Sequence, residues 1–212
     1  MIINLEETFK WRKEDEENAP LKHRQSEKLK NISSFFSGQE NFKLLLDTNV
    51  YTYMISKKVP GDFLSVIEKS LLYHCSVCLG ELSLGLAHDP DFGRFRKTVK
   101  ALHGVTKNIP KNRLYVPDKE IWLKAGIIAG KLARIQNFQK DQRKELLNDA
   151  LIFLTAAKHG IPVLTSDRND YDLIQQLHPD GEFVFYEVAA QSLATPEQQR
   201  APAFVAQAGD QG

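Results

Sequence analysis

The sequence of 212 residues contains few cysteines and no long apolar run. Its two cysteines, Cys75 and Cys78, are too few for a framework of disulfides. No apolar run approaches the roughly 20 residues of a membrane-spanning helix, so we expect no association with a membrane. The N-terminus, MIINLEETFKWRKEDEE, lacks the apolar core of a secretory signal. Together these absences predict a cytoplasmic protein.

The charge is almost balanced, but one stretch is strongly basic. A net charge of +1 excludes a protein that binds nucleic acid over its whole surface. From Arg94 to Pro117, however, the chain has seven Lys or Arg residues and no acid. Such a stretch could attract a phosphate backbone. A solvated helix face has the same composition, and composition alone leaves both interpretations open.

The pattern of apolar residues divides the chain into three parts. Residues 1–41 form a polar extension, and residues 189–212 form a tail rich in Ala, Gln and Pro for which we expect flexibility. Residues 42–188 alternate between short apolar runs and longer amphipathic ones, which predicts an α/β domain with a parallel sheet. The expected strands are 42–46, 71–77, 113–116, 161–165 and 182–188. The expected helices are 49–56, 61–69, 79–87, 91–102, 118–138, 143–159 and 168–177.

The helix expected over 143–159 is unusually apolar. From Ala150 to Ala157 its only polar residue is Thr155, so we expect it to be covered on nearly all sides and to pack against the centre of the sheet. The His-Gly pair at 159–160 should end it, and Pro162 prevents its continuation.

Four acidic residues are expected at one edge of this sheet. Asp47 follows the first strand directly, and Asp167 comes two residues after the strand at 161–165. Glu81 falls in the first turns of the helix after the second strand, and Asp149 lies near the start of the apolar helix. The carboxyl ends of parallel strands meet at one edge, where ligands bind. Buried carboxylates need a compensating cation, and Mg²⁺ prefers oxygen ligands.

Each acid also has a simpler interpretation when it is taken alone. Asp47 could be a turn residue or a helix N-cap, and Asp167 could belong to a turn. Glu81 could be solvated, and Asp149 could interact with the dipole of a helix N-terminus. Their coincidence at one edge favours a shared metal site.

Cys75 and Cys78 with His74 have the spacing of half a zinc site. The sequence has no second pair of cysteines to complete it. We therefore expect both cysteines to be packing residues of the strand and the start of the following helix.

The segments LLLDTNV, SVCLGELSLGL and NDALIFLTAAKHGIPVLTSD, with the last strand, resemble the PIN domain and more narrowly the VapC-type toxins of toxin–antitoxin pairs. The resemblance covers about residues 42–188. It implies a three-layer sandwich in which a five-stranded parallel sheet of order 3-2-1-4-5 has helices on both faces. It also implies a ribonuclease that uses one or two Mg²⁺ or Mn²⁺ ions, an antitoxin partner and a homodimer.

Carried over by position, the resemblance assigns metal binding and catalysis to four acids. These are Asp47, Glu81, Asp149 and Asp167. Asp170 and Asp172 compete with Asp167 for the last place, and Asn49 and Thr165 are expected to support Asp47. The expected contacts to RNA are Arg94, Arg96, Lys97 and Lys100.

Three other functions compete with a toxin ribonuclease. A housekeeping RNA-processing nuclease would use the same site without an antitoxin. A non-catalytic module that binds RNA or protein would not need all four acids. An aspartate-nucleophile phosphatase of the haloacid-dehalogenase kind would need a second acid two positions after Asp47, where this chain has Asn49.

Overall fold

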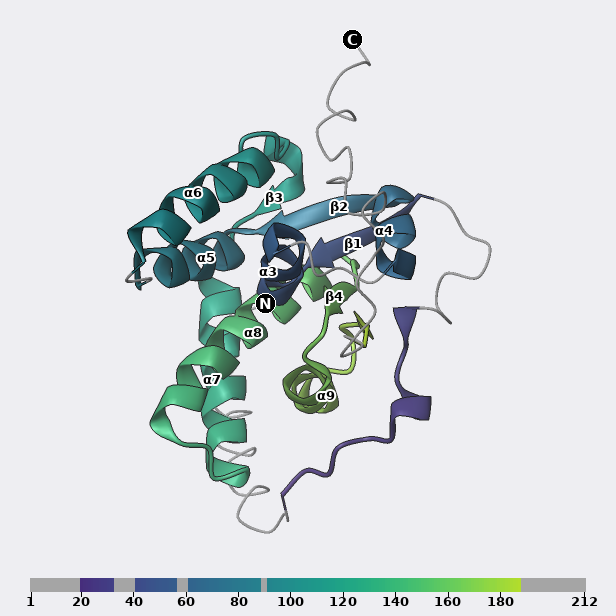
Figure 1. Ribbon diagram of the computed structural model, residues 1–212. Coiled ribbons are helices and arrows are strands. Elements are labelled where there is room, and N and C mark those ends of the chain that lie inside the picture. Colours follow the sequence, from purple (N-terminus) through teal and green to yellow (C-terminus); the bar gives the residue numbers. More distant parts are fainter. Residues whose placement is uncertain (1–19, 33–40, 57–60, 89–90, 188–212) are drawn as a thin grey trace.

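A parallel sheet of five strands forms the centre of the described chain (Figure 1). The computed structural model describes residues 20–32, 41–56, 61–88 and 91–187. The strand order is β3-β2-β1-β4-β5, as the resemblance implied. The strands are β1 (Phe42–Leu46), β2 (Ser70–Cys75), β3 (Leu114–Tyr115), β4 (Val163–Thr165) and β5 (Phe183–Phe185).

Helices connect the strands on both faces of the sheet. The helices are α3 (Thr48–Ser56), α4 (Gly61–Glu68), α5 (Ser76–His88), α6 (Phe92–Thr106), α7 (Lys119–Ile135), α8 (Lys140–Lys158) and α9 (Arg168–Leu177). The chain moves from β1 towards β3 at one edge, and then crosses to β4 and β5 on the other side of β1. Because crossovers between parallel strands are right-handed, this reversal places α3 to α6 on one face and α7 to α9 on the other.

The central strand β1 is apolar because both of its faces are covered. Leu44, Leu45 and Leu46 are fully buried. Leu45 pairs with Tyr73 of β2 on one side and with Val163 of β4 on the other. An uninterrupted apolar run is therefore compatible with this position, where alternating polar residues would leave polar groups buried.

Helix α8 is the buried helix that the sequence predicts, but it begins earlier. Its residues from Ala150 to Leu154 are buried. Gly160, just beyond the C-cap, has a φ of +61°, which glycine adopts without strain. The helix begins at Lys140 rather than at residue 143, so Asp149 lies in its middle. The interpretation of Asp149 as a partner of the helix N-terminal dipole is therefore wrong.

The second predicted strand is shorter than expected because α5 begins sooner. Strand β2 ends at Cys75 and α5 starts at Ser76, which places Glu81 in the second turn of that helix. Both cysteines are free and buried, and the Sγ of Cys78 lies 3.4 Å from the carbonyl oxygen of Leu46. The prediction that they are packing residues is confirmed.

A segment before β1 also belongs to the folded structure. Leu29 and Ile32 are buried in the core, and Asn31 forms a parallel bridge with Phe185 of β5. The backbone N–H of Phe185 donates to the carbonyl oxygen of Lys30 at 3.0 Å.

The division of the chain at residues 41 and 188 stays a prediction. Residues 1–19, 33–40 and the tail from 188 onwards lie outside the described residues. Within the described part of the chain, no helix has the length and apolar character needed to cross a bilayer.

Candidate metal centre

Asp47 stands at the carboxyl end of β1, where its buried carboxylate accepts several hydrogen bonds. The residue is 3% exposed. Its Oδ1 accepts from the N–H of Thr48 at 2.7 Å, and its Oδ2 accepts from Asn49 Nδ2 and Thr165 Oγ1, both at 2.6 Å. Helix α3 begins at Thr48, yet two of these three donors are side chains. Asp47 is therefore held by a small polar network and not only by the start of a helix.

Asn49 joins the ends of three strands. Its Nδ2 also contacts the Oγ1 of Thr165 at 3.0 Å. Its Oδ1 accepts from the N–H of Ser166 and from the hydroxyl of Tyr186, both at 3.2 Å. The amide thus connects the residues that follow β1, β4 and β5. The predicted support of Asp47 by Asn49 and Thr165 has this structural form.

Glu81 connects α5 to two other helices. Its carboxylate accepts hydrogen bonds from the hydroxyl of Thr48, at the start of α3, and from Nδ2 of Asn148 on α8 at 2.8 Å. The interpretation of Glu81 as a solvated helix residue does not describe these contacts. The bond between Asn148 and Glu81 was not predicted from the sequence.

Asp149, Asp167 and Asp170 form the tightest acidic group in the described chain. One carboxylate oxygen from each lies within 4.8 Å of the others. Asp149 comes from α8, and the other two come from the turn after β4 and from the start of α9. No described residue donates a hydrogen bond to the carboxylate of Asp149 or Asp170, whereas the carboxylates of Asp47 and Glu81 both accept hydrogen bonds.

Asp167 has a second role as the N-cap of α9. Its side chain accepts from the N–H groups of Asn169 and Asp170, both at 3.1 Å. Its own N–H donates to Thr165 Oγ1 at 2.9 Å. The simpler interpretation of Asp167 as a turn residue therefore holds alongside its place in the acidic group.

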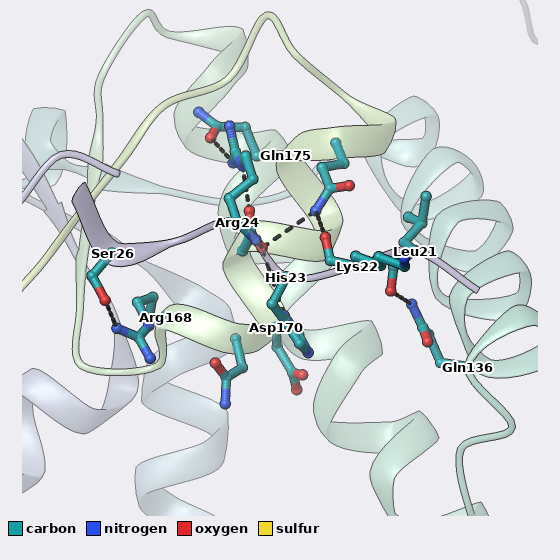
Figure 2. Close-up of polar contacts among 12 residues, drawn as sticks. Leu21, Lys22, His23, Arg24, Ser26, Gln136, Arg168, Asp170 and Gln175 are labelled. Atoms are coloured by element: carbon teal, nitrogen blue, oxygen red, sulfur yellow. Dashed lines mark hydrogen bonds and ion pairs between the residues drawn. The ribbon is translucent and has the colours of Figure 1, made fainter. Parts of the chain in front are cut away.

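Asp172, the third acid of this segment, is engaged elsewhere. It is 1% exposed and accepts from the backbone N–H of Arg24 at 2.8 Å and from the Nε of the same residue at 2.5 Å. Figure 2 shows the side chain of Arg24 next to Gln175, on the other side of this segment from Asp170. Of the three competing acids, the structure thus groups Asp167 and Asp170 with Asp149, and pairs Asp172 with a cation.

Burial and mutual repulsion make the carboxyl groups of Asp47, Asp149 and Asp170 hard to ionise. Burial raises the pKa of Asp47 to about 6, and the negative charge of Glu81 adds to the rise. The pKa of Asp149 is raised well above its usual range by burial and by the charges of Asp47, Asp167, Asp170 and Glu81. Burial and the charge of Asp167 raise the pKa of Asp170 to about 6.

A divalent cation would remove this penalty. The donors of the group are all carboxylate oxygens, which suit Mg²⁺ or Mn²⁺ and do not suit a zinc site of Cys and His. Asp149, Asp167 and Asp170 are close enough together to be ligands of one ion. The donor set therefore fits the metal that the sequence predicted.

Two tyrosines near the acids had no signal in the sequence. The hydroxyl of Tyr171 is buried and, among the described residues, has no hydrogen-bond partner of good geometry. Burial, with the charges of Asp47 and Asp149, raises its pKa well above the usual range. Tyr186 reaches Asn49 from beyond β5. Only the tertiary structure brings the two tyrosines to this edge.

The predicted RNA contacts lie on α6. Arg96, Lys97 and Lys100 are exposed on this helix, which packs on α5 and α3. The backbone of Arg94 belongs to the same helix, and its side chain lies outside the described part of the chain. That these residues bind RNA stays a prediction.

The fold and the site together define an α/β protein whose parallel sheet has the order 3-2-1-4-5 and carries a group of carboxylates at the carboxyl ends of its strands. The family model of the PIN domain matches residues 44–174. The chain belongs to the PIN domain family. No curated protein matches the chain.

Several solved structures are similar to this chain at low sequence identity. One is VapBC2 from Rickettsia felis bound to a promoter DNA fragment, at 16% identity, with a TM-score of 0.47 and coverage of 69% of this chain and 100% of that one. A second is FitAcB from Neisseria gonorrhoeae, at 16% identity, a TM-score of 0.48 and coverage of 70% and 99%. A third is DNA-bound VapBC from Salmonella typhimurium, at 18% identity, a TM-score of 0.49 and coverage of 68% and 98%.

Proposed function

We propose that this protein is a ribonuclease that depends on Mg²⁺ or Mn²⁺ and hydrolyses phosphodiester bonds of RNA. The observation that carries the proposal is the grouping of Asp149, Asp167 and Asp170 within 4.8 Å at the carboxyl edge of the sheet, next to buried Asp47. Membership of the PIN domain family, a family of nucleases, supports it. One or two ions are compatible with this number of acids.

The residues of the chain divide the work of such a site. Asp149, Asp167 and Asp170 would hold the metal directly, and Asp47 and Glu81 would bind it directly or through water. When bound, the ion lowers the pKa of a water molecule and neutralises charge on the phosphate. Asn49 and Thr165 fix the carboxylate of Asp47.

The test of this activity is a cleavage assay on single-stranded RNA with Mg²⁺, Mn²⁺ or a chelator. We expect cleavage only with metal, and a loss of about 1,000-fold or more in Asp149→Asn, because the ion would lose a ligand and the reaction its charge stabilisation. The matched control is Asp180→Asn, which removes an exposed acid after α9 and should retain full activity. Cleavage that persists in chelator, or in Asp149→Asn, would contradict the metal mechanism.

We further propose that the protein is the toxin of a toxin–antitoxin pair in the cytoplasm. The ordered motifs from LLLDTNV to VLTSD, which resemble those of VapC-type toxins, support this role. The same proposal includes an antitoxin partner and a toxin homodimer.

Expression in a bacterial host tests the toxin role. Wild type should arrest growth, Asp149→Asn should not, and co-expression of a small protein encoded next to the gene should restore growth. Cleavage in vitro without growth arrest would instead favour a housekeeping RNA-processing nuclease. The absence of cleavage, with RNA binding retained, would favour a non-catalytic module.

A further inference from the structure

The segment from Leu21 to Ser26 is fastened to the surface beside the acidic group (Figure 2). The Nε2 of Gln136 donates to the carbonyl oxygen of Leu21 at 2.9 Å, and the side chain of Arg168 donates to the hydroxyl of Ser26. The Nε2 of Gln176 donates to the carbonyl oxygen of Lys22 at 3.1 Å. These donors come from the end of α7 and from α9, so the segment follows the same helix that carries Asp170.

Arg24 is the central anchor of this segment. Besides its two bonds to Asp172, its guanidinium donates to Oε1 of Gln175 at 2.5 Å. Asp172 is 1% exposed, and a carboxylate so deeply buried is strongly destabilising without a cationic partner. The position of Arg24, and therefore of its neighbours in the chain, is fixed.

This anchor places one exposed nitrogen-bearing side chain, that of His23, beside the metal centre. The Nδ1 of His23 lies 3.6 Å from Oδ2 of Asp172, and about half of the His23 side chain is exposed. Figure 2 shows His23 next to Asp170. Lys22 is exposed as well.

An RNA strand at this site would need such a surface. Clustered carboxylates repel phosphates, and the bound ion compensates only the phosphate that it contacts. The phosphates on either side require donors from the protein, and Lys and His side chains bind phosphate oxygens without reading the base. Residues 21–29, which include this segment, contain one acid, Glu27, and four basic or imidazole side chains: Lys22, His23, Arg24 and Lys28.

We propose that residues 21–26 form one wall of the nuclease site, and that Lys22 and His23, held in place by the pairing of Arg24 with Asp172, bind the phosphates next to the one that is cleaved. The inference rests on the proposed ribonuclease function and adds a substrate-binding surface that precedes the family's domain in the chain. His23 and Lys22 bind substrate in this proposal, and Arg24 is a positioning residue.

Steady-state cleavage and RNA binding test the two exposed residues. We expect His23→Ala to raise KM about fivefold to tenfold with little change in kcat, because a hydrogen bond to a charged group is lost. In the non-cleaving Asp149→Asn background, Lys22→Gln should flatten the slope of log affinity against log salt by about 0.7, the value for one phosphate contact on a single strand. Loss of a merely structural contact would not change this slope.

Lys30→Gln is the matched control. Lys30 follows this segment in the chain and is exposed, but its Nζ pairs with Glu182 at 2.7 Å. We expect unchanged KM and salt slope. The same measurements on Lys97→Gln and Lys100→Gln compare the contribution of the exposed lysines of α6 to RNA binding with that of Lys22. If His23→Ala and Lys22→Gln behave like Lys30→Gln, the inference is overturned.

A double-mutant cycle tests the role of Arg24. Arg24→Ala should raise KM at least as much as His23→Ala does, and its effect should be clearly smaller in the His23→Ala background, since Arg24 acts partly through His23. Two full and independent effects would exclude this positioning role. Should Arg24→Ala fail to fold, the single substitutions at His23 and Lys22 still decide the inference.

The two proposals fail in different ways. If wild type cleaves RNA and neither substitution matters, the ribonuclease stands and the binding wall is wrong. If wild type does not cleave RNA, but its RNA affinity still depends on Lys22 and His23, the binding wall stands and the ribonuclease is wrong. A protein that does not bind RNA contradicts both.

Discussion

The acids at the carboxyl edge form two groups that the protein treats differently. Asp47 and Glu81 accept hydrogen bonds from neighbouring Thr and Asn side chains. Asp149, Asp167 and Asp170 lie close together, and of these three only Asp167 accepts hydrogen bonds from the described residues. Burial raises the pKa of Asp47 and of Asp170 alike, but the hydrogen bonds that Asp47 accepts oppose the rise. Asp149 and Asp170 accept no such bonds from the described residues, so a proton or a cation must compensate their carboxylates. The second group therefore marks where an ion would bind.

The largest expected effect separates the two groups by metal affinity. Asp149→Asn should weaken Mn²⁺ binding by about 100-fold, since it removes a direct ligand, and Asp47→Asn by about 10-fold, since Asp47 supports the site from beside it. Isothermal titration with Mn²⁺ measures both. Equal losses would show that Asp47 is as much a ligand as Asp149.

The two groups should also differ in metal-free stability. Asp47→Asn should destabilise the fold by about 1–3 kcal/mol, because an amide places N–H groups against the donors Asn49 and Thr165. Asp149→Asn should be neutral or stabilising, because it replaces a carboxyl group that burial and the neighbouring negative charges make hard to ionise. Urea unfolding in chelator measures both free energies. Destabilisation of similar size in both variants would remove the contrast.

A smaller effect is expected in the dependence of stability on pH. The pKa of Asp170 rises from 3.8 to about 6 on folding, so the native state binds the proton more tightly than the unfolded one. The stability that this provides is complete below pH 4 and is lost as the pH rises through 6. Unfolding of wild type and Asp170→Asn from pH 4 to pH 7.5, in chelator, should show wild type losing more stability.

The comparison with Asp170→Asn is needed because His74 acts in the opposite direction. Burial, helped by the charge of Arg113, lowers the pKa of His74 to about 4. Its contribution is lost as the pH falls from 6.5 towards 4. This contribution is common to wild type and variant and cancels in their difference. A flat difference curve would contradict the assignment for Asp170.

The smallest effect is expected at Asn148, whose side-chain amide donates a hydrogen bond to Glu81 of the first group. Asn148→Ala should leave Glu81 with the Thr48 hydroxyl as a partner and lower stability by about 0.5–1.5 kcal/mol, with only a few-fold loss of cleavage. Thermal unfolding and the cleavage assay measure the two effects. A loss of cleavage as large as in Asp149→Asn would place Asn148 in the catalytic group.

The sequence by itself determined the sheet and much of the site. The run FKLLL and the apolar helix around Leu151, with Gly160 and Pro162 after it, predicted a strand buried on both faces and the helix that covers it, because burial on both faces leaves an uninterrupted apolar pattern. The order of the strands was implied by the resemblance to the PIN domain. The sequence also predicted that acids after the strands would meet at one edge. Chain direction alone fixes that meeting point in a parallel sheet.

Only the tertiary structure decided how the acids divide. Asp167, Asp170 and Asp172 are nearly equivalent in the sequence, but α9 turns two of them towards Asp149 and the third towards Arg24. Side-chain direction on a helix changes by about 100° per residue, so neighbours in sequence face different partners. Pairing between Arg24 and Asp172, 148 positions apart, leaves no local pattern in composition or periodicity. The sequence therefore names the candidate ligands, and the packing of distant segments selects among them.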